Sequence, residues 1–139
     1  MASSLATLIV SSSFFVSFIL VLQLSSFPSC RADVGTAASY SAPYLPSACY
    51  GREATEFPSS NLFAAAGDGI WDNGAACGRQ YLVRCISAAQ PRTCIPDQSI
   101  QIKIVDYAPT ATTLVLSDKA FGSLANTSAA LINIEFQQV

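Results

Sequence analysis

The residues that can do chemistry in this chain of 139 are carboxylates, thiols, hydroxyls and lysine, because the sequence contains no histidine. A chain without histidine lacks the usual general base and the commonest metal ligand, which excludes Ser-His-Asp and Cys-His catalysis. The most suggestive carboxylate is Asp106, which ends an alternating apolar run and precedes Tyr107. An aspartate in such a position either contacts a ligand or accepts backbone N–H bonds in the following turn. Both roles stay open for Asp106.

Two short acidic segments resemble fragments of calcium-binding loops, Asp68-Gly69 and Asp72-Asn73-Gly74. Neither continues with the spaced oxygen ligands that a calcium loop requires. Both are therefore predicted to be turns, and no metal or cofactor is predicted.

Four cysteines, at Cys49, Cys77, Cys85 and Cys94, follow the N-terminal quarter of the chain. In a small secreted domain an even cysteine count predicts disulfides, here two. Zinc is disfavoured because the chain has no C-x-x-C pair and no histidine. Three connectivities remain open from spacing alone.

The N-terminal quarter predicts a secretory signal peptide. Residues 5–24 contain no charge, and residues 29–32 read Ser-Cys-Arg-Ala, so cleavage is expected after Ala32. This cut removes the fifth cysteine, Cys30, and leaves a domain of residues 33–139. The alternative is an uncleaved signal anchor, since the apolar run is long enough to span a bilayer.

The predicted mature domain is acidic. The chain has seven basic and nine acidic groups, and cleavage removes one basic group, Arg31, so residues 33–139 have a formal charge of −3. An acidic domain offers no basic patch for nucleic acid or an anionic membrane. We therefore expect no nucleic-acid partner and a mature protein that does not span a membrane.

Alternating apolar residues predict a mainly β domain. The clearest case is residues 99–106, where Ile100, Ile102 and Ile104 alternate with polar residues. Other strands are predicted over residues 35–40, 81–85, 112–116 and 131–137. Short strands without a βαβ rhythm indicate a compact barrel.

Helical structure is predicted to be sparse. Ser117 is a good N-cap for a short helix over residues 118–124. Residues 61–66 are expected to form one helical turn before a break at Gly67-Asp68-Gly69, and residues 41–47 and 85–96 are expected to be loops.

Five sequence blocks carry a family resemblance. They are Ser47-Ala48-Cys49-Tyr50-Gly51, residues 72–78 (DNGAACG), 81–85 (YLVRC), 102–109 (IKIVDYAP) and 134–136 (IEF). In this order they resemble the plant natriuretic peptide-like proteins, which are related to expansins, barwin and family-45 endoglucanases. The resemblance implies a six-stranded double-psi β-barrel with one or two short helices, in the apoplast or cell wall. It also implies the disulfides Cys49–Cys77 and Cys85–Cys94.

The sequence departs from these relatives after Asp106. They carry a third cysteine pair around this point, whereas residues 107–117 here contain no cysteine, and Val115 stands in place of an aspartate. Because both partners of the pair are absent, no stray thiol is left.

The resemblance makes Asp106 the counterpart of the general acid of family-45 endoglucanases. Inverting hydrolysis needs a second carboxylate, and the segment Tyr40-Ser41-Ala42-Pro43, where it is expected, contains no acid. Asp33 lies upstream and is a poor substitute. The protein is therefore predicted not to be an enzyme.

The aromatic residues are predicted to divide between a sugar-binding groove and the core. Tyr40 and Tyr107 are expected to lie near Asp106 as ligand contacts. The other groove candidates are Tyr44 and Tyr50, and the predicted core aromatics are Phe57, Phe63, Trp71, Phe121 and Phe136.

Asn126-Thr127-Ser128 is an N-glycosylation motif in a chain predicted to be secreted, and the alternative is an unmodified loop. The favoured function is that of a secreted, non-catalytic, monomeric protein with a systemic role in water and solute homeostasis, acting through a cell-surface receptor. The alternative is a wall-loosening module that binds cell-wall polysaccharide.

Overall fold

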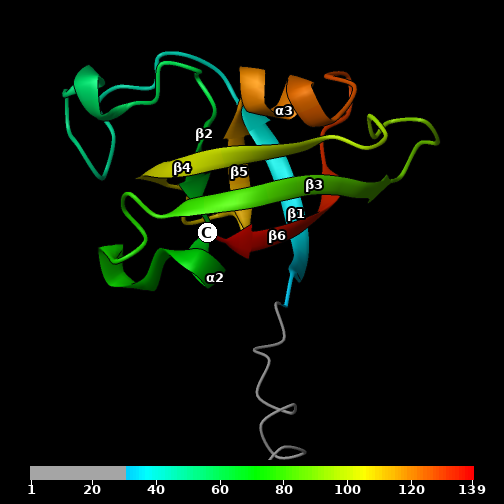
Figure 1. Ribbon diagram of the computed structural model, residues 1–139. Helices are drawn as coiled ribbons and strands as arrows, with labels where there is room; N and C mark the ends of the chain where they lie inside the picture. Colours follow the sequence, from blue (N-terminus) through cyan, green and yellow to red (C-terminus); the bar gives the residue numbers. More distant parts are fainter. Residues whose placement is uncertain (1–30) are drawn as a thin grey trace, which may run out of the picture. The chain divides into compact units, whose positions relative to one another are not determined.

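The computed structural model describes residues 31–139, so the predicted apolar leader lies outside the described residues. Six strands form one closed barrel in the order β1-β5-β2-β4-β3-β6 (Figure 1). The strands are β1 (Asp33–Tyr40), β2 (Phe63–Ala66), β3 (Gln80–Ala88), β4 (Ser99–Tyr107), β5 (Leu114–Ser117) and β6 (Ile132–Gln138). The helices are α2 (Asp68–Trp71) and α3 (Asp118–Leu124), with 3-10 turns η1 (Ala54–Glu56) and η2 (Asp72–Gly74).

The barrel mixes parallel and antiparallel pairing. β1 pairs with β5, and β2 with β4, in parallel, whereas the other four neighbouring pairs are antiparallel. A parallel pair cannot be joined by a tight hairpin, so longer connections must cross the barrel. The connection of residues 41–62, from β1 to β2, is the one that brings Cys49 and Ala48 to the end of β4.

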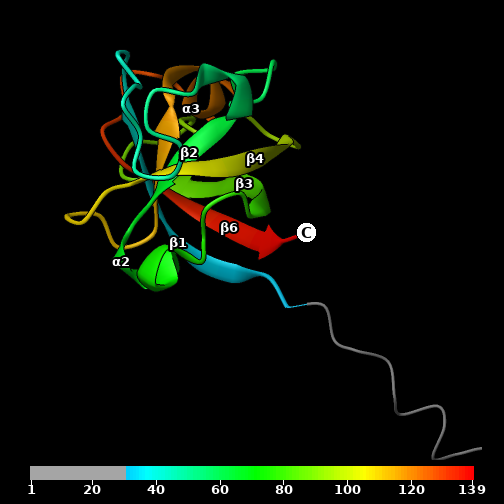
Figure 2. The same cartoon turned by 90° about the vertical axis from the view of Figure 1, so that its left-hand side faces the viewer.

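The core follows the alternation seen in the sequence. In β4 the side chains of Ile100, Ile102 and Ile104 are buried, as those of Tyr81 and Val83 are in β3. The two helices lie at opposite ends of the barrel (Figure 2).

The predicted helix over residues 118–124 is confirmed as α3. Its N-cap is Ser117, whose hydroxyl oxygen accepts a hydrogen bond from Ala120 N at 3.2 Å. Phe121 and Leu124 on the inner face of α3 are fully buried. Burying two large apolar side chains against the barrel stabilises a helix too short to form alone.

Residues 61–66 do not form the predicted helical turn. Phe63–Ala66 is strand β2, whose four residues are all buried between β4 and β5. The alanines favour helix locally, but pairing with a strand on each side outweighs that weak preference. The predicted break at Gly67-Asp68-Gly69 is also wrong, because α2 begins at Asp68.

Two disulfides link the four cysteines of the barrel domain, and they are the pairs that the resemblance implies. Cys49 is bonded to Cys77 and Cys85 to Cys94, with Cα–Cα distances of 5.4 Å in both. Among the described residues, no helix is long and apolar enough to cross a membrane.

Candidate functional site

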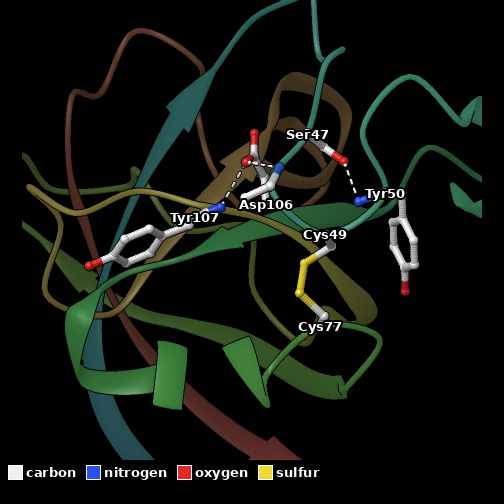
Figure 3. The surroundings of a disulfide bond; sticks show 7 residues. Ser47, Cys49, Tyr50, Cys77, Asp106 and Tyr107 are labelled. Carbon is white, nitrogen blue, oxygen red and sulfur yellow. Dashed lines mark hydrogen bonds between the residues drawn. A yellow bond between two sulfur atoms is a disulfide. The ribbon is translucent and has the colours of Figure 1, made fainter. Parts of the chain in front are cut away.

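The carboxylate of Asp106 joins the end of β4 to the connection of residues 41–62. Its Oδ1 atom accepts hydrogen bonds from Ala48 N and from Tyr107 N, both at 2.8 Å (Figure 3). Asp106 therefore takes the backbone-accepting role that its position suggested. Its second oxygen, Oδ2, accepts no hydrogen bond from the described residues, so this half-buried carboxylate keeps a free acceptor.

Tyr40 lies at the end of β1, and its ring contacts Tyr44 and Phe63. Its hydroxyl oxygen is buried and has no hydrogen-bond partner among the described residues. Burial raises the pKa of Tyr40, and the nearby charge of Asp106 and the neighbouring Tyr44 raise it further. The hydroxyl thus stays protonated and is a hydrogen-bond donor without an acceptor. No hydrogen bond joins Tyr40 to Asp106 among the described residues, so a ligand site shared by the two stays a prediction.

The ring of Tyr107 points away from the Asp106 carboxylate, although the two residues are adjacent (Figure 3). It stacks on Trp71 with ring centroids 4.4 Å apart and planes inclined by 15°. Its hydroxyl donates a hydrogen bond to Asp68 Oδ1, and this bond is the main reason that the pKa of Tyr107 is raised. Tyr107 therefore belongs to a surface beside α2, apart from the Tyr40 hydroxyl.

Trp71 is a site candidate that the sequence analysis assigned to the core. It is only partly buried and covers one face of the Tyr107 ring. Asp68 and Trp71 are three residues apart in α2 and so share one side of the helix. The stacking of Trp71 on Tyr107 was not predicted, because residues 67–69 were expected to form a break and not the start of a helix.

The other aromatic residues form a cluster beside Tyr40. Phe63 packs edge-on against the rings of Tyr44 and Phe57, at centroid distances of 4.7 and 4.8 Å. Tyr44 in turn packs edge-on against Tyr40 at 4.9 Å. Tyr44, Phe57 and Phe63 also line an open groove of about 450 Å³, together with prolines of the same connection. Tyr40 does not line this apolar groove but contacts it through the Tyr44 ring.

Three predicted assignments are refined by these contacts. Phe57 and Phe136 are partly exposed, so of the predicted core aromatics only Phe63 and Phe121 are fully buried. Tyr50 lies under the ammonium group of Lys103, 5.1 Å from its ring centroid. Lys103 also donates a hydrogen bond to Glu56 O at 2.7 Å, so Tyr50 helps to anchor the connection.

Asp118 lies beside Ser41, in the segment after β1 that contains no acidic residue of its own. Its Oδ1 accepts a hydrogen bond from Ser41 Oγ at 3.1 Å, and its backbone N donates to the Tyr44 hydroxyl at 3.2 Å. This contact is not visible in the sequence, because the two segments are separated by 77 positions. Within residues 31–139, no three His, Cys, Asp or Glu side chains converge on a point that would hold a metal ion.

The fold and site define a small disulfide-linked barrel, and comparisons with known proteins place it in a class. Residues 64–136 match the family model described as lytic transglycolase, which carries the double-psi β-barrel domain. An EG45-like domain containing protein from Citrus jambhiri is 40% identical over 111 residues, which cover 77% of this chain and 82% of that protein. EG45-like domain containing protein 2 from Arabidopsis thaliana is 35% identical over 129 residues, covering 90% and 95% of the two chains. The chain therefore belongs to the EG45-like, expansin-like family.

Solved structures confirm the barrel fold. An expansin from Clavibacter michiganensis superimposes with a TM-score of 0.59 at 21% identity. The match covers 78% of this chain and 50% of the expansin, so this chain spans about half the length of that protein. A mutant of the same expansin, with a TM-score of 0.62, was solved in complex with cellohexaose. A Streptomyces papain inhibitor matches with a TM-score of 0.54 at 19% identity.

Proposed function

We propose that this protein is a secreted, non-catalytic member of its family that binds a cell-wall glucan at Tyr40 and Asp106. The observation that carries the proposal is the free Oδ2 of the half-buried Asp106 carboxylate. The Tyr40 hydroxyl is a buried donor without a partner among the described residues, so a ligand would have to displace the atoms that cover it in order to accept from it. Sugar hydroxyls can donate to a carboxylate oxygen and accept from a phenolic hydroxyl. The cellohexaose complex of the related expansin supports a β-linked glucan as the ligand class.

The apolar groove beside Tyr40 supports a ligand longer than one sugar. Sugar rings present apolar C–H faces as well as hydroxyls, and binding sites combine a few placed polar groups with apolar walls. Tyr44 lines this groove and contacts Tyr40, so one extended chain can follow both surfaces.

A non-catalytic role is supported by the hydrogen bonding of the acids. Inverting glycosidases hold two carboxylates about 6.5–9.5 Å apart across the scissile bond, one as acid and one as base. Asp106 uses Oδ1 for two backbone N–H groups and has one oxygen left for a ligand, and Asp118 is bonded to Ser41 and not to Asp106. We therefore expect no release of reducing sugar from amorphous cellulose.

Secretion is supported by the position of the expected cut. Strand β1 begins at Asp33, so cleavage after Ala32 would remove no residue of the barrel. The two disulfides also suit an oxidising compartment. Localisation in the apoplast or cell wall remains part of the proposal.

The test is retention of the secreted protein on insoluble β-glucan, measured as depletion from solution at increasing polysaccharide. Asp106→Asn keeps an Oδ1 acceptor for the two backbone bonds but replaces the free Oδ2 acceptor with an amide NH2 group, which donates. A hydrogen bond to a charged group contributes about 1.5–3 kcal/mol, so we expect affinity to fall about tenfold or more. Tyr40→Phe should weaken retention by a smaller factor.

Two control variants match these changes outside the site. Asp97→Asn makes the same charge change in an exposed turn, and Tyr50→Phe removes a hydroxyl while keeping the ring under Lys103. Both should bind like the wild type. Absence of retention by the wild-type protein would overturn the glucan-binding proposal, whereas equal losses in all four variants would place the binding site elsewhere.

The systemic role in water and solute homeostasis is a second hypothesis, and the family resemblance is what supports it. Its partner would be a cell-surface receptor, and a monomer would suffice to bind one. Uptake of water by plant cells exposed to the wild type and to Asp106→Asn would separate the two hypotheses. A response that survives loss of glucan retention would favour the receptor.

A further inference from the structure

The loop between α3 and β6 contains the Asn126-Thr127-Ser128 motif, which glucan binding does not use. All three residues are exposed. We propose that Asn126 carries an asparagine-linked glycan in the mature protein. This inference rests on the secretion component of the proposed function and is independent of glucan binding.

The side chain of Asn126 presents its amide nitrogen to solvent. Its Oδ1 atom accepts hydrogen bonds from Ser128 N at 3.0 Å and from Ser128 Oγ at 2.9 Å. Its Nδ2 atom makes no hydrogen bond with any described residue. The amide oxygen is thus the only side-chain atom of Asn126 that the fold uses, and the nitrogen that would be modified is free.

The backbone around Asn126 keeps the motif on the surface. Asn126 N donates to Thr93 O at 2.8 Å, and Ala129 N donates back to Asn126 O at 3.1 Å. The preceding residue, Ala125, pairs with Cys94 of the Cys85–Cys94 disulfide. These bonds use backbone atoms only, so a bulky group on Nδ2 displaces none of them.

The modification is a group transfer from a lipid-pyrophosphate-linked oligosaccharide. A bond forms between Asn126 Nδ2 and the anomeric carbon of the first sugar. The bond between that carbon and the pyrophosphate oxygen breaks, the lipid pyrophosphate leaves with the electron pair, and Nδ2 loses one proton. No atom is oxidised or reduced. Ser128 supplies the hydroxyl that the motif requires at its third position.

The surface around the motif suits a glycan. Two large apolar side chains near it are exposed, Leu131 at 53% and Ile95 at 38%. Ile95 N donates to Leu124 O at the end of α3, which places this residue beside the motif. A hydrophilic oligosaccharide on Asn126 would shield these side chains from other molecules.

The glycan would stand away from the proposed glucan site. Asp118, at the start of α3, contacts Ser41 and Tyr44, whereas Asn126 follows the other end of the helix. Seven residues of helix separate the two ends by about 10 Å. Loss of the glycan should therefore leave retention on insoluble glucan unchanged.

The test is intact mass of the full-length gene product expressed in plant cells and collected from the medium. Wild type and Ser128→Thr, which keeps the hydroxyl, should both carry one oligosaccharide. Ser128→Ala and Asn126→Gln should both have the mass of the polypeptide alone. Enzymatic removal of the glycan should convert Asn126 to aspartate, a gain of about one mass unit in the peptide that contains it.

The outcomes separate this inference from the proposed secretion. Wild-type protein in the medium with an unmodified Asn126 would overturn the glycan and leave secretion standing. Failure of any chain to reach the medium would overturn secretion, and with it the glycan. A glycan that persists in Asn126→Gln would also contradict the assignment, because it would be attached elsewhere.

Discussion

The two connections near the Asp106 end of the barrel are held in different ways. Residues 41–62, between β1 and β2, are fastened by side chains. Cys49 is bonded to Cys77, Asp106 accepts from Ala48 N, and Lys103 binds Glu56 O. Residues 108–113, between β4 and β5, are fastened mainly by backbone hydrogen bonds to the start of α2.

Three of these backbone bonds run in parallel from α2 to the shorter connection. Gly67 N donates to Thr113 O at 2.8 Å, Asp68 N to Ala111 O at 3.0 Å and Gly69 N to Thr112 O at 3.1 Å. Such close approach requires the absence of side chains. A Cβ atom at Gly67 would lie 2.5 Å from Ala111 O, and one at Gly69 would lie 2.7 Å from Thr112 O.

The difference explains how the chain tolerates the loss of a cysteine pair. The short connection is the region where the resembling proteins carry two further cysteines. Here the backbone bonds to α2, together with the bond from Thr36 N to the Thr113 hydroxyl, fix the same segment. The long connection has little regular structure, so covalent and side-chain anchors hold it instead.

Among the variants that test this difference, the largest loss of stability should come from removing the disulfide of the long connection, residues 41–62. The double variant Cys49→Ala/Cys77→Ala releases a loop whose ends are 28 positions apart. Chain entropy predicts a loss of about 3–4 kcal/mol in the free energy of unfolding, measured by urea denaturation. The matched variant Cys85→Ala/Cys94→Ala opens a loop of separation 9 and should lose about 1 kcal/mol less. Equal losses would show that loop length does not determine how much each disulfide contributes to the free energy of unfolding.

The next largest effect should come from Gly67→Ala in the contact with the short connection. The added Cβ meets a backbone carbonyl that has no freedom to rotate away, so α2 and residues 111–113 must separate. Overpacking of this kind costs about 1–3 kcal/mol, and the lost hydrogen bonds add to it. Thermal unfolding of the purified variant measures the loss.

Gly51→Ala is the control for Gly67→Ala. It lies in the long connection, where an added Cβ meets nothing within 4 Å, but its φ of +57° disfavours alanine. The expected loss is about 1 kcal/mol, from backbone conformation alone. A loss at Gly67 no larger than that at Gly51 would contradict the close-contact explanation.

The sequence predicted most of this architecture because the relevant signals are local. Alternation in residues 99–106 and the N-cap at Ser117 gave β4 and α3 nearly to the residue. By contrast, β2 is a run of Phe-Ala-Ala-Ala with no alternation, and its strand conformation comes from neighbours on both sides. No local signal in residues 61–66 predicts such pairing.

The candidate site was predictable only in part, for the same reason. Asp106 and Tyr40 each end a predicted strand, but β1 and β4 are not neighbours and run in opposite directions, so strand pairing alone does not predict that the two residues approach each other. The direction of the Tyr107 ring depends instead on Trp71 and Asp68, which come from a helix that the sequence did not predict. The contact between Ser41 and Asp118 also depends on the barrel closing.

The smallest effect should come from Tyr40→Phe, which tests the site where the long connection meets β1. Removing a buried hydroxyl without a partner removes a desolvation cost, so stability at pH 7 should stay within about 1 kcal/mol of wild type or rise slightly. Urea denaturation at neutral pH measures this difference. A substantial loss would show that the hydroxyl has a partner, and the donor proposed for glucan binding would then be occupied.

The pH dependence of the same variant gives a second readout. The pKa of Tyr40 is raised in the folded protein, whereas unfolded tyrosine titrates near about pH 10. Above that pH the unfolded chain has lost the proton that the folded chain retains, so wild-type stability must fall as pH rises. Tyr40→Phe lacks this contribution and should lose stability less steeply between about pH 10 and 11, because the other tyrosines are common to both proteins. Identical slopes would mean that Tyr40 titrates normally and that its hydroxyl is not desolvated in the folded protein.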